Sequence, residues 1–177
     1  GKADALAELT GPKHFFIPDD ELPYKFEPGG ANHEGCAGLL ALGEYLKVVA
    51  GADPGAPCDR AVIERAFDHM AALEAPLTER LLSFLNGRDD VRVVGPAQAG
   101  PDRVATVSFL HDRLRSRAIS VAVDRSEVAI RHGHMYAWHR VEALGHDVDD
   151  GVVRISAVHY NTPEEIERLI EVLDGLL

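Results

Sequence analysis

The stretch Val152–Glu165, which reads VVRISAVHYNTPEE, determines much of the fold of this chain. An alternating apolar run carries a single charge, Arg154, and ends in a Tyr-Asn pair. Thr162 can then cap a helix that has Pro163 at its first position, and Glu165 stands where a capping box requires it. We therefore predict a strand, a tight turn and a helix, in that order.

Arg154 is the unusual residue of this stretch, because a charge within a buried strand needs a partner. One explanation is a structural ion pair with one of the many acidic side chains of the chain. The other is a bound carboxylate, because the planar guanidinium matches that group with two hydrogen bonds. The residues of the stretch alone leave both explanations open.

Outward from this stretch, the pattern after residue 58 alternates between helices and short strands. A long helical pattern covers residues 59–85, and Pro76 should kink or divide it. We then predict strands near 91–94, 104–110, 128–131 and 152–158, with helices near 112–123, 136–144 and 163–176. This order predicts one α/β layer with helices on one face of a small sheet.

The first part of the chain has a different character. Residues 1–31 look irregular, with a short helix near 3–9 and extended pieces near 14–17 and 24–27. A helix should follow over about 32–49, and the Gly/Pro-rich loop 50–58 is a candidate boundary. We therefore predict a division into segment 1–58 and a unit formed by residues 59–177.

Composition restricts the class of protein. The 177 residues carry a net charge of −11, which argues against nucleic acid or an anionic membrane as the partner. No apolar run approaches the roughly 20 residues that span a bilayer, and no signal peptide is visible. Cys36 and Cys58 form no CxxC or zinc pattern, so we expect a cytoplasmic protein in which Cys36 is a buried helix residue.

A second motif precedes the first predicted long helix. Residues 25–39 read KFEPGGANHEGCAGL, so that Gly29 and Gly30 end an extended piece just before a helix. Glycines let a backbone approach a ligand closely, and the amides of a helix N-terminus suit a phosphate. A plain turn explains the same residues, so this motif taken alone is a weak signal.

Together, the two motifs resemble the class V aminotransferase family, in particular its cysteine-desulfurase-like branch. The glycine motif matches that branch at Phe26, Glu27, Gly29, Asn32, Gly35, Gly38 and Leu39. The resemblance implies the C-terminal small domain of a fold type I enzyme dependent on pyridoxal 5'-phosphate, with a mixed sheet covered by helices, after the tail of the large domain. It implies a homodimer in which Arg154 grips the carboxylate of an amino-acid substrate. Gly29, Gly30 and Asn32 then line the phosphate site of the cofactor in the neighbouring subunit.

The chain departs from the family pattern in three places. Gly30 stands where the family has a threonine that donates its hydroxyl to the phosphate. Tyr136 replaces the cysteine that attacks sulfur in the desulfurases, within a loop where Arg131 and His134 could contact substrate. The Schiff-base lysine of the family matches none of the four lysines, so we expect this chain to be the C-terminal portion of a longer enzyme.

Other titratable groups have simpler explanations. His132, His134 and His139 cluster in the sequence, but their spacing fits no standard zinc site and we predict no metal. The Asp-Asp pairs at 19–20, 89–90 and 149–150 fall in predicted turns, where we expect solvated side chains.

Two functions remain open from the sequence. The first is an enzyme that acts on an amino acid as a C–S lyase, transaminase or epimerase, with pyridoxal phosphate as electron sink. The second is a non-catalytic α/β module for binding or dimerisation, which the missing lysine favours.

Overall fold

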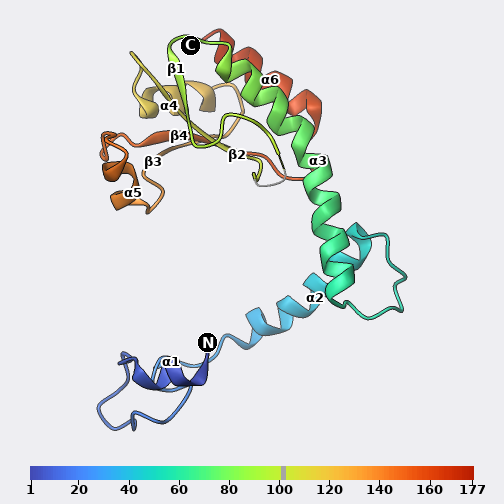
Figure 1. Cartoon of the computed structure of the whole chain (residues 1–177), viewed down its shortest axis with the longest axis vertical. Helices are drawn as coiled ribbons and strands as arrows, with labels where there is room; N and C mark the ends of the chain where they lie inside the picture. Colours follow the sequence, from blue (N-terminus) through green and yellow to red (C-terminus); the bar gives the residue numbers. More distant parts are fainter. Residues whose placement is uncertain (101–102) are drawn as a thin grey trace.

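The computed structural model describes residues 1–100 and 103–177, and it places an α/β layer at one end of the molecule and a helical arm at the other (Figure 1). The elements in chain order are α1 (Ala3–Glu8), α2 (His33–Val49), α3 (Arg60–Asn86), β1 (Val91–Val94), β2 (Thr106–His111), α4 (Ser116–Asp124), β3 (Arg131–Gly133), α5 (Trp138–Ala143), β4 (Val152–Ser156) and α6 (Pro163–Asp174). After α3 this is the predicted β-β-α-β-α-β-α order, which confirms the α/β class.

The four strands form one sheet in the order β1-β2-β4-β3, and each of the three neighbouring pairs is antiparallel. The expectation of a mixed sheet is therefore wrong in this detail. The crossover through α4 sets β2 and β3 in the same direction, but β4 is inserted between them and runs opposite to both. Parallel strands are thus present without being hydrogen-bonded neighbours.

Helices α3, α4 and α6 contact one another or the strands on one face of the sheet, and the core lies between them (Figure 1). Side chains alternate along each strand, so that Val107, Phe109 and Val153 are completely buried against these helices. The last helix begins as predicted, because Thr162 and Glu165 form a complete capping box. This helix start fixes the turn that follows strand β4.

Helix α3 runs unbroken past Pro76. The proline removes one helical hydrogen bond, but Leu77, Leu81 and Leu85 directly after it are buried in the core. Their burial outweighs the lost bond, so the expected division of this helix does not occur.

Most side chains of the arm, residues 1–58, are exposed to solvent. The two pieces expected to be extended form turns, because hydrogen bonds such as those from the amides of Ile17 and Lys25 fold them locally. Phe15 is 97% exposed and Leu39 is 67% exposed. Cys36 is exposed rather than buried, because its stretch of α2 lies away from α3 and from the sheet. We keep the division near residue 58 as a proposal.

Across the described residues, no helix combines the length and apolar character that crossing a membrane would require.

Candidate active site

Arg154 lies in the middle of β4, directly opposite Ser108 of β2 on one side and Arg131 of β3 on the other. Its neighbours Val153 and Ile155 point into the core, so the alternation of the strand directs Arg154 to the other face of the sheet. The residue is half-buried, and its Nε is buried without a hydrogen-bond partner among the described residues. A buried guanidinium nitrogen without a partner is costly, which points to an external acceptor.

The face around Arg154 is positively charged. Arg92 and Arg131 share it by strand alternation, and within residues 1–100 and 103–177 neither of these arginines nor Arg154 forms an ion pair. Burial lowers the pKa of His146, and the charge of Arg92 lowers this pKa further. In a chain of net charge −11, a face of unpaired arginines is suited to an anionic ligand.

His134 follows β3 in a loop with an unusual backbone. Met135 and Tyr136 both have positive φ angles, 51° and 61°, which residues other than glycine rarely adopt. The Nδ1 of His134 accepts a hydrogen bond of 3.1 Å from the amide of Tyr136, and its ring lies edge-on to those of Tyr136 and Trp138. Tyr136 itself is fully exposed.

The structure therefore brings Arg131 to Arg154 directly, whereas His134 belongs to an aromatic cluster beyond the end of β3. Strained backbone in a loop is often associated with function, so this loop stays a candidate for substrate contact. Among the residues that the structure describes, no group of histidine, cysteine and acidic side chains is arranged to hold a metal ion.

Gly29 and Gly30 lie in the arm, far from the sheet that carries Arg154 (Figure 1). A Cβ added to either glycine would meet nothing within 4 Å, so their backbone is open to a ligand. Asn32 caps α2, because its Oδ1 accepts a 2.6 Å hydrogen bond from the amide of Gly35. This loop fits a phosphate through its free amides at a helix start, while the Asn32 oxygen is already used by the helix.

The lysines are engaged elsewhere. The Nζ of Lys25 is buried and donates to the carbonyls of Leu6 and Ala7 at the end of α1. Lys13 binds the carbonyl of Ile17, and Lys47 binds that of Pro54. Three of the four lysines thus stabilise the arm itself.

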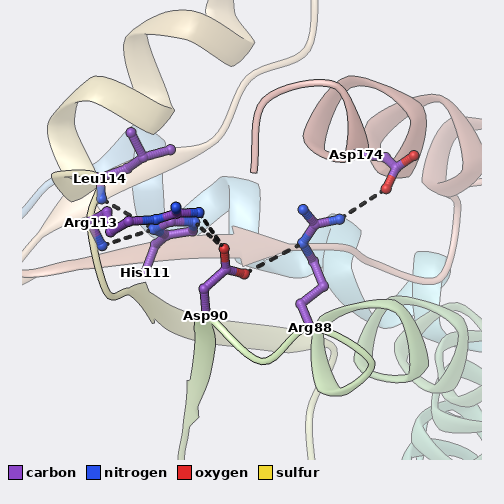
Figure 2. A network of polar contacts seen from close by, with 6 residues as sticks. All are labelled: Arg88, Asp90, His111, Arg113, Leu114 and Asp174. Carbon is purple, nitrogen blue, oxygen red and sulfur yellow. Dashed lines mark hydrogen bonds and ion pairs between the residues drawn. The ribbon is translucent and has the colours of Figure 1, made fainter.

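A polar network that no sequence pattern predicts lies at the end of β2 (Figure 2). His111 is buried, and its Nδ1 accepts the amides of Arg113 and Leu114, each at 3.1 Å. Its Nε2 therefore carries the proton and lies 3.3 Å from Oδ2 of Asp90, at ion-pair distance without hydrogen-bond alignment. The ring is enclosed, so we assign it to the stability of the turn rather than to chemistry.

Asp90 holds this network together. Burial would raise the pKa of Asp90, but the nearby His111, a backbone amide and Arg113 outweigh burial and lower it. Arg113 donates to Asp90 at 2.9 Å, and Arg88 connects the same carboxylate with Asp174 of α6. The prediction that the pair at 89–90 is merely solvated is therefore wrong for Asp90.

Asp150 is a second acid with a structural role. Its carboxylate accepts the amides of Ser116 and Arg117, at 2.6 and 3.2 Å, and so caps α4 from a distant loop. Burial would raise the pKa of Asp150, but these amides and Arg115 together lower it. The prediction of a solvated side chain is therefore wrong for Asp150, because the helix that it caps lies more than thirty residues earlier in the chain.

Comparison with known proteins places both motifs within one family match. A sequence model of the family Aminotransferase class-V matches residues 19–169, which include both the glycine loop and Arg154. The chain belongs to the class V aminotransferase family. Pyridoxal phosphate is the cofactor of class V aminotransferases and cysteine desulfurases, so the predicted family and cofactor class are confirmed.

Individual class V relatives agree with this assignment. The chain is 33% identical to the "Aminotransferase-like protein FGM3" of Gibberella zeae over 179 aligned residues, which cover all of this chain and 41% of that protein. It is 32% identical to a probable cysteine desulfurase of Xylella fastidiosa, over 85% of this chain and 31% of the relative. The chain thus spans about a third to two-fifths of the length of these relatives.

Solved structures give the same class V fold. The cysteine desulfurase of Thermococcus onnurineus NA1 aligns with a TM-score of 0.62 and 25% identity, over 87% of this chain and 33% of that one. The Escherichia coli cysteine desulfurase CsdA aligns with a TM-score of 0.66 and 22% identity, over 99% of this chain and 40% of that one, which supports the fold alone.

Proposed function

We propose that this chain forms the substrate-carboxylate side of a pyridoxal-phosphate enzyme that acts on an amino acid. The observation that carries the proposal is Arg154, a half-buried guanidinium on an acid-free strand face, whose Nε has no partner among the described residues. A carboxylate bound there satisfies the orphaned donors with two parallel hydrogen bonds.

Arg131 supports this assignment. It lies opposite Arg154 on the neighbouring strand, so the two side chains leave the same face of the sheet. Two unpaired cations this close repel each other, and a bound acid relieves the repulsion. Arg154 then holds and orients the substrate, while Arg131 raises the local positive potential.

The proposed reaction does not use a sulfur nucleophile at the loop after β3. By the resemblance of its loop to the family motif, Tyr136 stands in place of the desulfurase cysteine, and a phenol cannot carry a persulfide. Pyridoxal phosphate, when bound, supplies an electron sink for bond breaking at the α-carbon, which leaves C–S lyase, transaminase or epimerase chemistry. The protein contribution at this site is the binding and orientation of the amino acid.

The glycine loop serves a different active site in this proposal. The arm that contains Gly29 and Gly30 lies away from the sheet that carries Arg154 (Figure 1), and a Cβ added to either glycine would meet nothing within 4 Å. A homodimer that crosses the arms can bring this loop to the cofactor phosphate of the neighbouring subunit. The exposed apolar side chains of the arm, such as Phe15 and Leu40, are the surface that such an assembly would bury.

The test is Arg154→Ala in the intact protein loaded with pyridoxal phosphate. Binding of the twenty common amino acids is measured first, and turnover is measured for those that bind. Loss of a bidentate, charge-assisted contact costs about 1.5–3 kcal/mol, so we expect a ten- to hundredfold weaker binding. The absorbance of the bound cofactor should stay as in the parent protein, because Arg154 is assigned to substrate.

Arg117→Ala is the matched control, since Arg117 is an exposed arginine at the start of α4. It should leave amino-acid binding unchanged. Equal affinities in the parent and in Arg154→Ala would overturn the proposal. If no cofactor binds and no amino acid turns over, the non-catalytic module becomes the better explanation.

A further inference from the structure

Three side chains from distant parts of the chain meet beside the arm. The Oη of Tyr45, on α2, is hydrogen-bonded to Nε2 of His159, in the turn between β4 and α6. The Nδ1 of His159 lies 3.8 Å from Oε1 of Glu74, on α3. Each polar atom of the imidazole thus faces a partner of fitting chemistry, with Nδ1–H toward the carboxylate and Nε2 toward the hydroxyl.

Two of the three side chains in this arrangement are largely sheltered from solvent, whereas Tyr45 is 42% exposed. The side chains of His159 and Glu74 are only 16% and 21% exposed. The ring of Tyr160 packs edge-on to His159 with centroids 5.1 Å apart, which restricts rotation of the imidazole. The carboxylate of Glu74, 3.8 Å away and not hydrogen-bonded, favours a proton on Nδ1 by its charge, which leaves Nε2 to accept the hydroxyl of Tyr45.

The contact joins two parts of the molecule that are otherwise connected only through α3. Helix α2 packs on α3, and in the parts of the chain that the structure describes, Tyr45–His159 is the one hydrogen bond between residues 1–58 and residues 88–177. Its two ends belong to the helix that follows the glycine loop and to the turn that follows the Arg154 strand.

A small rotation of α2 at this contact displaces the distant glycine loop by several ångströms. At 1.5 Å per residue, Asn32 lies about 20 Å along α2 from Tyr45. A rotation of α2 by about 10° at Tyr45 therefore moves the glycine loop by about 3 Å. Misplacement of about 1 Å in a binding site can cost about a hundredfold in rate.

We propose that Glu74, His159 and Tyr45 form a positioning triad that sets the angle between α2 and the α/β layer. The geometric claim stands by itself, while its consequence for catalysis rests on the proposed function. Tyr45 and His159 contact neither substrate nor cofactor in this proposal, and they act by placing the glycine loop.

The experiment measures the angle directly, by the distance between two spin labels on the intact protein. The exposed Cys36 on α2 takes one label, and Glu171→Cys on the exposed side of α6 takes the other. The background carries Cys58→Ser, so that only these two sites react. We expect one narrow distance distribution. Tyr45→Phe should broaden it or shift it by about 2 Å, because Cys36 lies about 13 Å along α2 from Tyr45.

Three further variants separate this role from simple packing. His159→Phe keeps a ring without an acceptor and should broaden the distribution, whereas His159→Gln keeps an acceptor for Tyr45 and should restore much of the narrow form. Tyr160→Phe is the matched control, because the hydroxyl of Tyr160 has no partner among the described residues, and it should change nothing. Circular dichroism confirms that each variant is folded.

An unchanged distribution in both Tyr45→Phe and His159→Phe would overturn the triad. Equal broadening in His159→Gln and His159→Phe would also count against it, because a hydrogen-bond acceptor for Tyr45 would then not be what holds α2. Arg154→Ala separates this proposal from the proposed function, since it should weaken amino-acid binding and leave the label distance unchanged. Either the triad or the proposed function can therefore fail while the other holds.

Discussion

Replacing Asp150 with alanine should destabilise the protein by about 3 kcal/mol, a value that follows from the two amides it binds. The amide of Ser116 belongs to a buried residue and loses its 2.6 Å acceptor, which costs about 2 kcal/mol because water cannot easily replace it. The amide of Arg117 belongs to an exposed residue, so the loss of its 3.2 Å bond costs about 1 kcal/mol or less.

Urea denaturation followed by circular dichroism measures this difference. The midpoint should fall while the slope stays constant, because the same surface is exposed on unfolding. Asp149→Ala is the matched control, since Asp149 is exposed and adjacent, and its change should lie within about 0.5 kcal/mol. Equal destabilisation by the two substitutions would refute the capping role of Asp150.

The pH dependence gives an independent check on Asp150. Its pKa is lowered in the folded protein, so its contribution is fully present above the unfolded-state pKa of about 4. The contribution is lost as the pH falls below that value and through the folded-state pKa. The unfolding free energy of Asp150→Asn should therefore fall less steeply below about pH 4 than that of the parent protein.

Two further predictions concern α6 and the arm. Thr162→Ala removes the oxygen that accepts a hydrogen bond from the amide of Glu165. It should lower the unfolding free energy by about 1 kcal/mol in the same urea assay. An unchanged unfolding free energy would contradict the capping box. The exposed apolar side chains of α2, which include Leu39 and Leu40, should bind a hydrophobic dye. Replacing both leucines with serine should reduce the fluorescence of the dye. Equal fluorescence in the parent and the variant would place the dye elsewhere.

Much of the fold follows from local patterns in the sequence. The capping box at Thr162 and the alternation around Arg154 each depend on a few adjacent residues, so the starts of α6 and β4 could be predicted, although each element ends two residues earlier than expected. The order of strands in the sheet cannot be predicted in this way, because it depends on which strand lies between β2 and β3. Alternation along each strand holds no information about that choice, which is why the mixed sheet was wrongly expected.

The candidate site was predictable only in part, for a similar reason. The chemistry of Arg154 suggests a carboxylate from the residue type alone, but its neighbour Arg131 becomes significant only once β3 and β4 are paired. Asp90 and Glu74, the acidic partners of His111 and His159, come from elements far away in the chain. Contacts of this kind leave no periodic or local signal in a single sequence.

The most direct test of the central claim compares one amino acid with its primary amide, which keeps the side chain and loses the acid. The amino acid is the tightest binder of the twenty common ones, measured on the intact protein loaded with pyridoxal phosphate. In the parent protein the acid should bind ten- to a hundredfold more tightly than the amide, which corresponds to about 1.5–3 kcal/mol for the Arg154 contact. In Arg154→Ala this preference should shrink to near one, and a preference that survives the substitution would contradict the account.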